Sequence, residues 1–317
     1  MVKFIKKIKV NFLIRKSLRF FDKKEFDSAL SLINEVLLIF PNCEKALYLK
    51  GKIYQVFGKP TESQICYEKI IKINSKFIHA WIEKAMCFAI LKKYDEALKA
   101  LDDGLNFNNN NHGMIRIKIQ FLKDFGRYDE CLDYINFVLK NVDKELGIEL
   151  KAEMFLSEGK FIDSCSYFRK LCVLNSENIN AWYGLSSASY FLGNLDDAIK
   201  YMENCIELDK KNSTFLLLYA SYLIENELYD KSLKVLNKSI KKYNDFNFYY
   251  LRGLCLDFLN NEKKAEKSYK KGLKIGLKLV KLYPDENFHE VIGIILERLN
   301  YSDETREYFE KYNELNS

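Results

Sequence analysis

The chain has 317 residues, of which 48% are apolar and 30% charged, and its 50 basic and 44 acidic side chains give a net charge of +6. With only 3 prolines and 13 glycines, the sequence has too few turn-forming residues for a sheet-rich protein of this length, so helices are expected. An aromatic content of 15% excludes intrinsic disorder, and the charge excess is small for a dedicated nucleic-acid binder.

The amino terminus is basic but lacks the features of an export signal. Lysines interrupt the first ten residues, so no continuous apolar segment follows the initial charges. No apolar run reaches the roughly 18 residues that cross a bilayer. The eight cysteines are dispersed and form no Cys-Xaa-Xaa-Cys pair, which is typical of free thiols in a reducing compartment. We therefore expect a cytoplasmic protein without membrane insertion.

A short motif recurs along the chain, and its spacing defines a repeat. Copies of the motif are Phe26-Asp-Ser-Ala29, Tyr94-Asp-Glu-Ala97, Tyr128-Asp-Glu-Cys131, Leu195-Asp-Asp-Ala198 and Tyr229-Asp-Lys-Ser232. The same register yields nine units, which start near Val10, Glu44, Ile78, His112, Glu145, Ile179, Ser213, Phe246 and Glu286. The starts are 33 or 34 residues apart, except for 40 before the last. Such a period is typical of stacked helical units that bury their apolar faces against their neighbours.

Three positions of the repeat indicate how its helices pack. The eighth position is small in eight of the nine units, and the twentieth is small in all nine, as at Ala97 and Ala198. The twenty-fourth is large in every unit, for example Phe168 and Met202. Small residues let two helix backbones approach closely, and the large residue fills the space that they leave. This complementarity predicts one helical hairpin per unit.

The pattern resembles the tetratricopeptide repeat, a 34-residue helix-turn-helix with Trp, Leu, Gly, Tyr, Ala, Phe and Pro at fixed offsets. The best copy runs from Ala181-Trp182-Tyr183-Gly-Leu185 through Leu192-Gly193-Asn-Leu195-Asp-Asp-Ala198. The resemblance implies an all-α fold, a right-handed α-solenoid superhelix of about nine tandem helix-turn-helix hairpins.

The same register predicts how the chain is organised. We expect a basic extension of the first helix at residues 1–9 and a single solenoid of tetratricopeptide repeats at residues 10–317. Six additional residues before Pro284 predict a longer second helix in unit eight. The last unit, residues 286–317, is expected to be a cap with a polar outer face.

No arrangement of side chains predicts catalysis. The three histidines lie in different units, and no nucleophile has an evident neighbouring base. Glu149 and Glu153 lie one helical turn apart, but we expect them to face Arg116 and Gln120 of the preceding unit as an ion-paired wall. The prediction is a protein that is not an enzyme, with no cofactor and no metal site.

In the tetratricopeptide repeat family, first helices of successive units line a concave groove that binds a partner segment. By this resemblance, units two to four offer a mixed basic and apolar wall suited to an acidic or carboxylate-bearing peptide. The residues of this wall are Tyr48, Lys52, His79, Ile82, Met86, Arg116, Gln120 and Lys123. Units six to eight offer an aromatic, weakly polar wall suited to protein recognition. The residues of this second wall are Asn180, Tyr183, Ser187, Tyr190, Leu217, Ser221, Asn247, Tyr250, Leu254 and Asp257.

The function predicted from the groove is a protein-protein interaction scaffold that binds a protein or peptide segment. The alternative for any single groove residue is burial between helices.

A second candidate surface is basic. Residues 231–281 hold fourteen basic and four acidic residues. Six lysines recur there at helical spacing and form a stripe: Lys263, Lys267, Lys270, Lys274, Lys278 and Lys281. A solvated outer face is the simpler interpretation, and binding of RNA or an acidic partner is the functional alternative.

Overall fold

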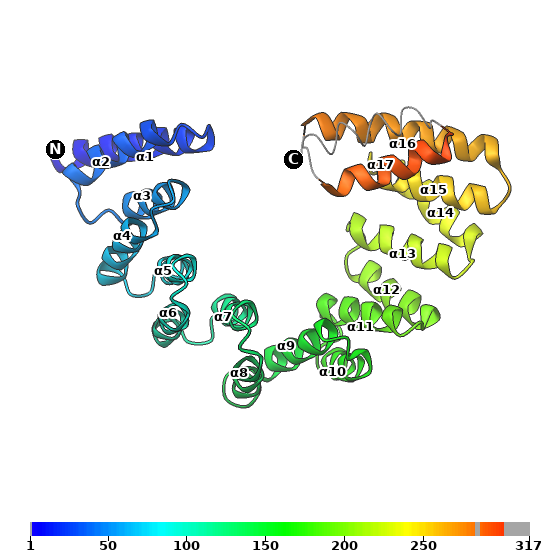
Figure 1. The fold of residues 1–317 in the computed structure, drawn as a ribbon, viewed down its shortest axis with the longest axis horizontal. Helices are drawn as coiled ribbons and strands as arrows, with labels where there is room; N and C mark the ends of the chain where they lie inside the picture. The colour runs from blue at the N-terminus through cyan, green and yellow to red at the C-terminus, as the bar shows by residue number, and fades with distance from the viewer. Residues whose placement is uncertain (1, 283–285, 301–317) are drawn as a thin grey trace. The chain divides into compact units, whose positions relative to one another are not determined.

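The structure, a computed structural model, describes residues 2–282 and 286–300. These residues form seventeen α-helices and no strand (Figure 1). The expected all-α fold of tandem helical hairpins is therefore confirmed. The chain divides into two compact units, Met1–Leu150 and Lys151–Ser317.

In the first unit, each odd-numbered helix opens a repeat and the next helix closes it. The helices are α1 (Val2–Asp22), α2 (Phe26–Ile39), α3 (Glu44–Val56), α4 (Pro60–Ile73), α5 (Ile78–Ile90), α6 (Tyr94–Phe107), α7 (His112–Asp124) and α8 (Tyr128–Asn141). Helix α1 packs against α2, α3 against α4, and α5 against α6. Helix α9 (Lys144–Ser157) runs across the division between the two units.

The second unit continues the same alternation. Its helices are α10 (Phe161–Leu174), α11 (Ile179–Phe191), α12 (Leu195–Leu208), α13 (Ser213–Glu225), α14 (Tyr229–Ser239), α15 (Phe246–Phe258), α16 (Glu262–Leu282) and α17 (Glu286–Arg298). Helix α16 has 21 residues where α12 has 14, so it contains the additional residues noted before Pro284. The second helix of the expected cap, after residue 300, lies outside the described residues.

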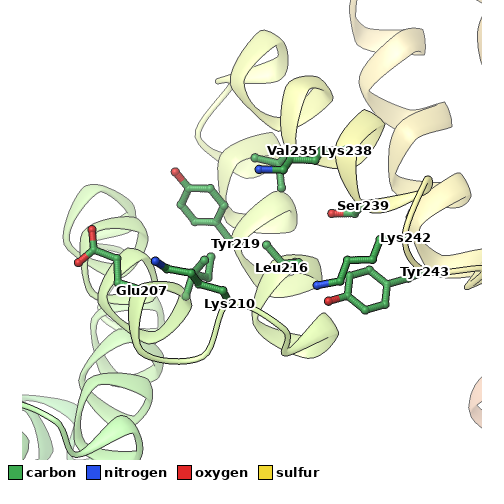
Figure 2. A pocket seen from close by; sticks show the side chains of 10 residues that line it. Glu207, Lys210, Leu216, Tyr219, Val235, Lys238, Ser239, Lys242 and Tyr243 are labelled. Atoms are coloured by element: carbon green, nitrogen blue, oxygen red, sulfur yellow. The ribbon is translucent and has the colours of Figure 1, made fainter.

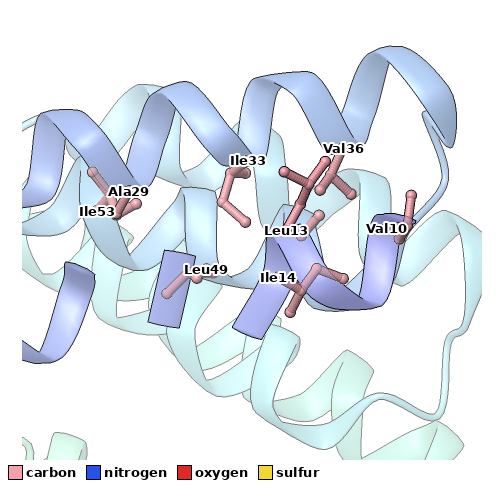
Figure 3. Close-up of a cluster of buried hydrophobic side chains, with 9 residues drawn as sticks. Val10, Leu13, Ile14, Ala29, Ile33, Val36, Leu49 and Ile53 are labelled. Atoms are coloured by element: carbon pink, nitrogen blue, oxygen red, sulfur yellow. The ribbon is translucent and has the colours of Figure 1, made fainter. Parts of the chain in front are cut away.

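The small and large repeat positions meet in the core as the register requires. Ala97 and Ala198, at the twentieth position, are fully buried. A Cβ atom built on Gly253, at the eighth position, would lie 2.2 Å from the ring of Tyr269, at the twenty-fourth. The ring therefore occupies the space that a side chain at the eighth position would need. Figure 3 shows the first such core, in which α1, α2 and α3 contribute Val10, Leu13, Ile14, Ala29, Ile33, Val36, Leu49 and Ile53.

A hydroxyl group ties the two helices together in five repeats. Where serine occupies one of the two small positions, its Oγ donates to the backbone carbonyl of the other small position. The pairs are Ser17 to Ala29 at 3.0 Å, Ser63 to Gly51 at 2.8 Å, Ser164 to Ala152 at 2.9 Å, Ser186 to Ala198 at 2.7 Å and Ser232 to Ala220 at 3.0 Å. Serine is therefore accommodated in an apolar core because its hydroxyl is hydrogen-bonded there.

In each of the eight repeats whose two helices the structure describes, one residue with left-handed backbone lies in the turn between them. Glycine fills this position in four repeats, at Gly58, Gly126, Gly159 and Gly193, with φ between 66° and 80°. In the other four it is Lys24, Lys92, Glu227 or Asn260, with φ between 56° and 62°, and Asn300 after α17 has a φ of 56°. The left-handed backbone of the turn is thus kept even where the residue is not glycine, the residue type that adopts this conformation most readily.

Candidate interaction surfaces

All eighteen predicted groove residues are half-buried or exposed, and none is buried in the core. Those of the first unit lie on α3, α5 and α7, and we call them the α3–α5–α7 surface. Those of the second unit lie on α11, α13 and α15, and we call them the α11–α13–α15 surface. Thirteen of the eighteen are only half-exposed, and some, such as Tyr48, Leu217 and Tyr250, pack against core clusters, so burial between helices applies to these in part.

The α3–α5–α7 surface has an acidic centre that sequence reasoning missed. Glu83 on α5 accepts hydrogen bonds from three side chains of α3: Tyr48 Oη at 3.2 Å, Lys52 Nζ at 3.0 Å and Gln55 Nε2 at 2.8 Å. The Glu83 side chain is 16% exposed. Burial and this neighbouring carboxylate raise the pKa of Tyr48 to about 12. Lys52 is therefore held in an internal ion pair.

The second cation of this surface is paired as well. Arg116 Nη2 lies 2.8 Å from Glu149 Oε2, so the predicted ion pair between these residues is confirmed. Gln120, by contrast, donates to Asp124 Oδ1 on its own helix at 2.7 Å. With Lys52 and Arg116 both bound to carboxylates, the surface offers less positive charge to an acidic peptide than its residue types indicate.

An apolar stripe accompanies these ion pairs. Ile82, Met86 and Ile90 follow one another at intervals of four on α5, so they share one face of the helix. Met86 is 41% exposed and Ile90 is 58% exposed. A pocket of about 570 Å³ lies at the start of the stripe, where His79, Ile82 and Ile117 form part of its lining. Lys123 is half-buried on α7.

The α11–α13–α15 surface is built from aromatic rings. Tyr190 on α11 stacks on Tyr222 of α13, with ring centroids 4.7 Å apart and an interplanar angle of 16°. Tyr183 lies 5.8 Å from Phe215 by ring centroids. A hydrogen bond with the Glu225 carboxylate raises the pKa of Tyr190, so its hydroxyl remains a donor at neutral pH.

The rest of this surface is mildly polar. Tyr269 donates to Asp257 Oδ2 at 2.6 Å and lies 6.5 Å from Tyr250 by ring centroids. Ser221 donates to the carbonyl of Leu218 at 2.8 Å. The half-buried residues are Ser187, Leu217, Asn247 and Leu254. Asn180 is exposed at the start of α11.

The basic stripe lies on α16. Five of its lysines, Lys263, Lys267, Lys270, Lys274 and Lys278, are exposed. The side chain of Lys281 lies outside the described residues. Lys270 Nζ lies 2.5 Å from Glu266 Oε1 one turn earlier. The stripe is thus solvated along one helix face, with one of its charges compensated locally.

The described residues offer little for redox or metal chemistry. All eight cysteines are free, and seven of them are buried. Burial raises the pKa of the Cys172 thiol to about 11, which keeps it protonated at neutral pH. Within residues 2–282 and 286–300, no group of three or more His, Cys, Asp or Glu residues is arranged to hold a metal ion. No helix in this part of the chain has the length and apolarity needed to cross a membrane.

The repeat register has a counterpart among known protein families. The sequence profile described as Tetratricopeptide repeat matches residues 44–77, 179–212 and 246–275. The chain is a tetratricopeptide repeat protein. The three matched segments are unit two, unit six and most of unit eight of the register, so the profile and the helix boundaries agree on where repeats begin.

Relatives of this tetratricopeptide repeat protein are distant. The TPR repeat-containing protein MJ1428 of Methanocaldococcus jannaschii is 22% identical over 252 residues, which cover 70% of this chain and 44% of that protein. The human DnaJ homolog subfamily C member 3 is 25% identical over 213 residues, which cover 62% of this chain and 40% of that protein. The chain thus spans less than half the length of these curated relatives.

Among solved structures, a tetratricopeptide repeat protein from Parabacteroides merdae is similar to 91% of this chain over 99% of its own length, with 17% identity and a TM-score of 0.45.

The tetratricopeptide repeat protein also has pockets on its second helices, where the family resemblance names no binding residue. We call one the α6–α8 niche, a pocket of about 280 Å³ whose lining includes Asp102, Lys118, Arg127 and Tyr134. The other is the α12–α14 niche, of about 370 Å³, lined by Ile206, Glu207, Lys210, Leu216, Tyr219, Val235, Lys238, Ser239, Lys242 and Tyr243. The sequence signal that could have revealed the α12–α14 niche was the occurrence of lysines at particular repeat positions along α14.

Two of the three cations that line the α6–α8 niche, Lys118 and Arg127, are paired within the protein, and the third is Lys99. Lys118 Nζ lies 2.5 Å from Asp102 Oδ1 and 3.9 Å from the centroid of the Tyr134 ring. Arg127 binds Asp95 and Glu130, each at 2.6 Å. Burial and the charge of Asp102 raise the pKa of Tyr134 to about 12. Internal ion pairs therefore neutralise two of the three cations of this niche.

Proposed function

We propose that this tetratricopeptide repeat protein is an interaction scaffold whose first helices bind a segment of a partner protein, without catalysis. The observation that carries the proposal is the aromatic α11–α13–α15 surface. Tyr183 is 40% exposed there, beside the stacked rings of Tyr190 and Tyr222. Rigid aromatic side chains at the exterior provide large contact areas at a low entropic cost, which is how protein-binding surfaces obtain most of their affinity.

The α3–α5–α7 surface supports the same proposal with different chemistry. Because Lys52 and Arg116 are already paired, the apolar stripe of Ile82, Met86 and Ile90 is the feature of this surface best suited to contact a partner. Apolar side chains spaced along a partner helix or extended segment would fit such a stripe. We propose that this surface recognises apolar rather than acidic side chains.

The test is affinity capture from a lysate of the source cells with the wild-type chain and the variant Tyr183→Ala plus Tyr250→Ala. A partner that binds through the α11–α13–α15 surface is captured by the wild type and lost with this variant. The matched control is Tyr128→Ala, a tyrosine that is exposed on the second helix α8. Circular dichroism of each variant establishes that helix content is retained. Equal capture of the same proteins by the wild type and the double variant would contradict the proposal.

A second candidate function is binding of RNA or an acidic partner along α16, favoured by the five exposed stripe lysines. Counterion release would make RNA affinity fall steeply with salt concentration. Lys263→Glu plus Lys270→Glu should abolish it. RNA binding that is absent, or that is insensitive to salt, would rule this candidate out.

We also propose that the protein works in a reducing compartment, the cytoplasm. The eight free cysteines support this assignment, because no pair is linked in the structure. Fluorescence microscopy of the tagged chain in its source cells is the test, and an exported chain would contradict it.

A further inference from the structure

The α12–α14 niche combines an apolar floor with a basic rim (Figure 2). Ile206, Leu216 and Val235 contribute aliphatic side chains from three consecutive helices. The lysines of the rim come from three places, the loop after α12, helix α14 and the segment that follows α14: Lys210, Lys238 and Lys242. The niche shares no residue with the α11–α13–α15 surface or with the stripe on α16, so what it binds is independent of the proposed function.

Like most lysines that the structure describes, the rim lysines have no carboxylate within ion-pair range, and Lys242 Nζ lies 4.8 Å from the centroid of the Tyr243 ring. Among the described residues, no carboxylate lies within 4.0 Å of the Nζ atom of Lys210, Lys238 or Lys242. The lining contains one acidic residue, Glu207. The nearby Glu203 already accepts from Tyr219 at 2.6 Å and from Lys231 at 2.9 Å. The niche thus presents an excess of positive charge that the protein itself does not compensate.

We propose that the α12–α14 niche binds an acidic peptide segment of a partner protein, with one bulky apolar side chain on the floor and flanking carboxylates at the rim lysines. The volume of about 370 Å³ is at the lower end of the range of small-molecule sites, and it suits a large side chain with part of its backbone. The lysines are distributed around the rim, so they match several carboxylates spaced along a chain. Ser239, which is 4% exposed, adds a hydroxyl to the lining.

The same lining is poorly suited to nucleic acid. Base recognition in single-stranded RNA uses aromatic rings that are free to stack. Here Tyr219 is buried, and the ring of Tyr243 already stacks on Phe248 with centroids 5.7 Å apart. The hydroxyl of Tyr243 donates to the carbonyl of Lys211 at 2.7 Å. The aliphatic floor offers no hydrogen-bond partners to the edges of a base, whereas it accepts an apolar side chain.

The test uses the full chain and fluorescein-labelled peptides. The first probe has one phenylalanine flanked by two aspartates on each side, the second replaces phenylalanine with alanine, and the third replaces the aspartates with asparagines. Fluorescence anisotropy measures each affinity at about 0.15 M salt, where exposed charges more than roughly 8 Å apart are largely screened. We expect the first probe to bind and each replacement to weaken binding about tenfold.

Two protein variants locate the binding on the structure. Lys238→Gln plus Lys242→Gln removes two rim charges and should weaken binding of the first probe about tenfold. The matched control is Lys234→Gln plus Lys241→Gln, two exposed lysines of the same region that do not line the niche. The control should bind within about twofold of the wild type, since rim charges and not total charge determine the affinity.

Several outcomes would overturn the proposal. Absence of binding, equal binding of the asparagine probe, or equal loss in both lysine variants would each do so. Displacement of the probe by an oligouridine strand that binds more tightly, and whose binding is lost with Lys238→Gln plus Lys242→Gln, would assign the niche to RNA instead. None of these outcomes bears on Tyr183 or Tyr250, so failure here is distinguishable from failure of the groove proposal.

Discussion

Lys118 and Arg127 of the α6–α8 niche are bound to carboxylates of the protein, whereas the three lysines of the α12–α14 niche have no carboxylate of the described residues within 4.0 Å. The two niches overlap in the repeat only in part. Lys118 and Tyr219 both occupy the seventh position of their units, and Tyr134 and Val235 both occupy the twenty-third, but the other lining residues stand at different repeat positions. Related parts of two repeats thus differ in how far internal ion pairs neutralise their cations.

The comparison shows which parts of a repeat are constrained. In the repeats whose two helices the structure describes, the helices touch at the eighth, twentieth and twenty-fourth positions, so residue size is restricted there by close packing. At the outer positions that line the niches, neighbouring helices leave space, and any side chain that tolerates solvent is accommodated. Residue identity in this chain therefore varies most at positions that the packing does not restrict.

The largest loss of stability should come from substitutions at the buried twentieth position of the repeat, which is small in both regions. Ala97→Leu beside the α6–α8 niche and Ala198→Leu beside the α12–α14 niche should each destabilise the protein by about 1–3 kcal/mol, because both alanines are fully buried at helix contacts. Urea denaturation followed by circular dichroism measures the loss. Lys238→Leu, at an exposed site, should change stability by less than about 0.5 kcal/mol. Equal melting temperatures for Ala198→Leu and Lys238→Leu would contradict the packing register.

The next effect is an alkaline loss of stability that arises at Tyr134 in the α6–α8 niche. The pKa of Tyr134 is raised to about 12 by burial and by Asp102, while Val235 at the equivalent position cannot ionise. Above pH 10 the unfolded chain loses the phenolic proton before the folded chain does. The stabilisation by the protonated ring is therefore complete below pH 10 and is lost as the pH rises toward 12.

Unfolding free energies of the wild type and Tyr134→Phe, measured from pH 9 to 12, test this effect. We expect a steeper alkaline decline in the wild type. Asp102→Asn should make the decline smaller and end it at a lower pH, because it removes the charge that opposes ionisation of the ring in the folded chain. An unchanged slope in Tyr134→Phe would show that the ring is not responsible.

A smaller effect should follow from breaking the ion pairs of the α6–α8 niche. The Lys118 side chain is 12% exposed and that of Asp102 is 50% exposed, so the pair is partly screened by solvent. Asp102→Asn at neutral pH should cost about 0.5–1 kcal/mol. Lys238→Gln in the other niche should cost nothing measurable, since its ammonium group has no internal partner. Chemical denaturation measures both changes, and an equal loss of unfolding free energy in Asp102→Asn and Lys238→Gln would contradict the difference between the niches.

The smallest effect concerns the turns that precede both niches. Lys92 before α6 and Glu227 before α14 have φ of 57° and 58°. Glycine removes the steric cost of left-handed backbone but increases the entropy of the unfolded chain, so Lys92→Gly and Glu227→Gly should each stabilise by about 0.5 kcal/mol or less. Lys93→Gly is the control, because φ of Lys93 is −93° and glycine there brings only the entropic cost. Stabilisation by the control would refute this account.

Much of the fold could be predicted from the sequence because each hairpin is local. The register placed the starts of α3, α5, α7, α11 and α13 at the residues where these helices begin. The ion pair of Arg116 and Glu149 was also accessible, because equivalent positions of adjacent repeats face each other. The groove residues were predicted by resemblance, and their common exposure agrees with a surface role that remains a proposal.

Other features of the surfaces could not be predicted from the sequence. Glu83 gathers hydrogen bonds from Tyr48, Lys52 and Gln55, although it is not one of the family's groove positions. The lysines of the α12–α14 niche are spread over 33 residues of sequence, from Lys210 to Lys242, and only packing of α12, α13 and α14 brings them to one pocket. Helical spacing relates Tyr48, Lys52 and Gln55 to one another, and Lys238 to Lys242, but it does not show that Glu83 or Lys210 lies beside them.

The sequence by itself determined the repeat, its two helices and the residues at their contact, because helical periodicity and residue size act over one hairpin and recur nine times. For most charges other than Arg116 and Glu149, tertiary structure decided which are neutralised and which stay exposed. An ion pair forms or fails within about 4 Å, and that distance depends on how each helix of one repeat sits on the helices of the next. Repeat spacing specifies the neighbours of a residue but not the direction in which its side chain reaches them.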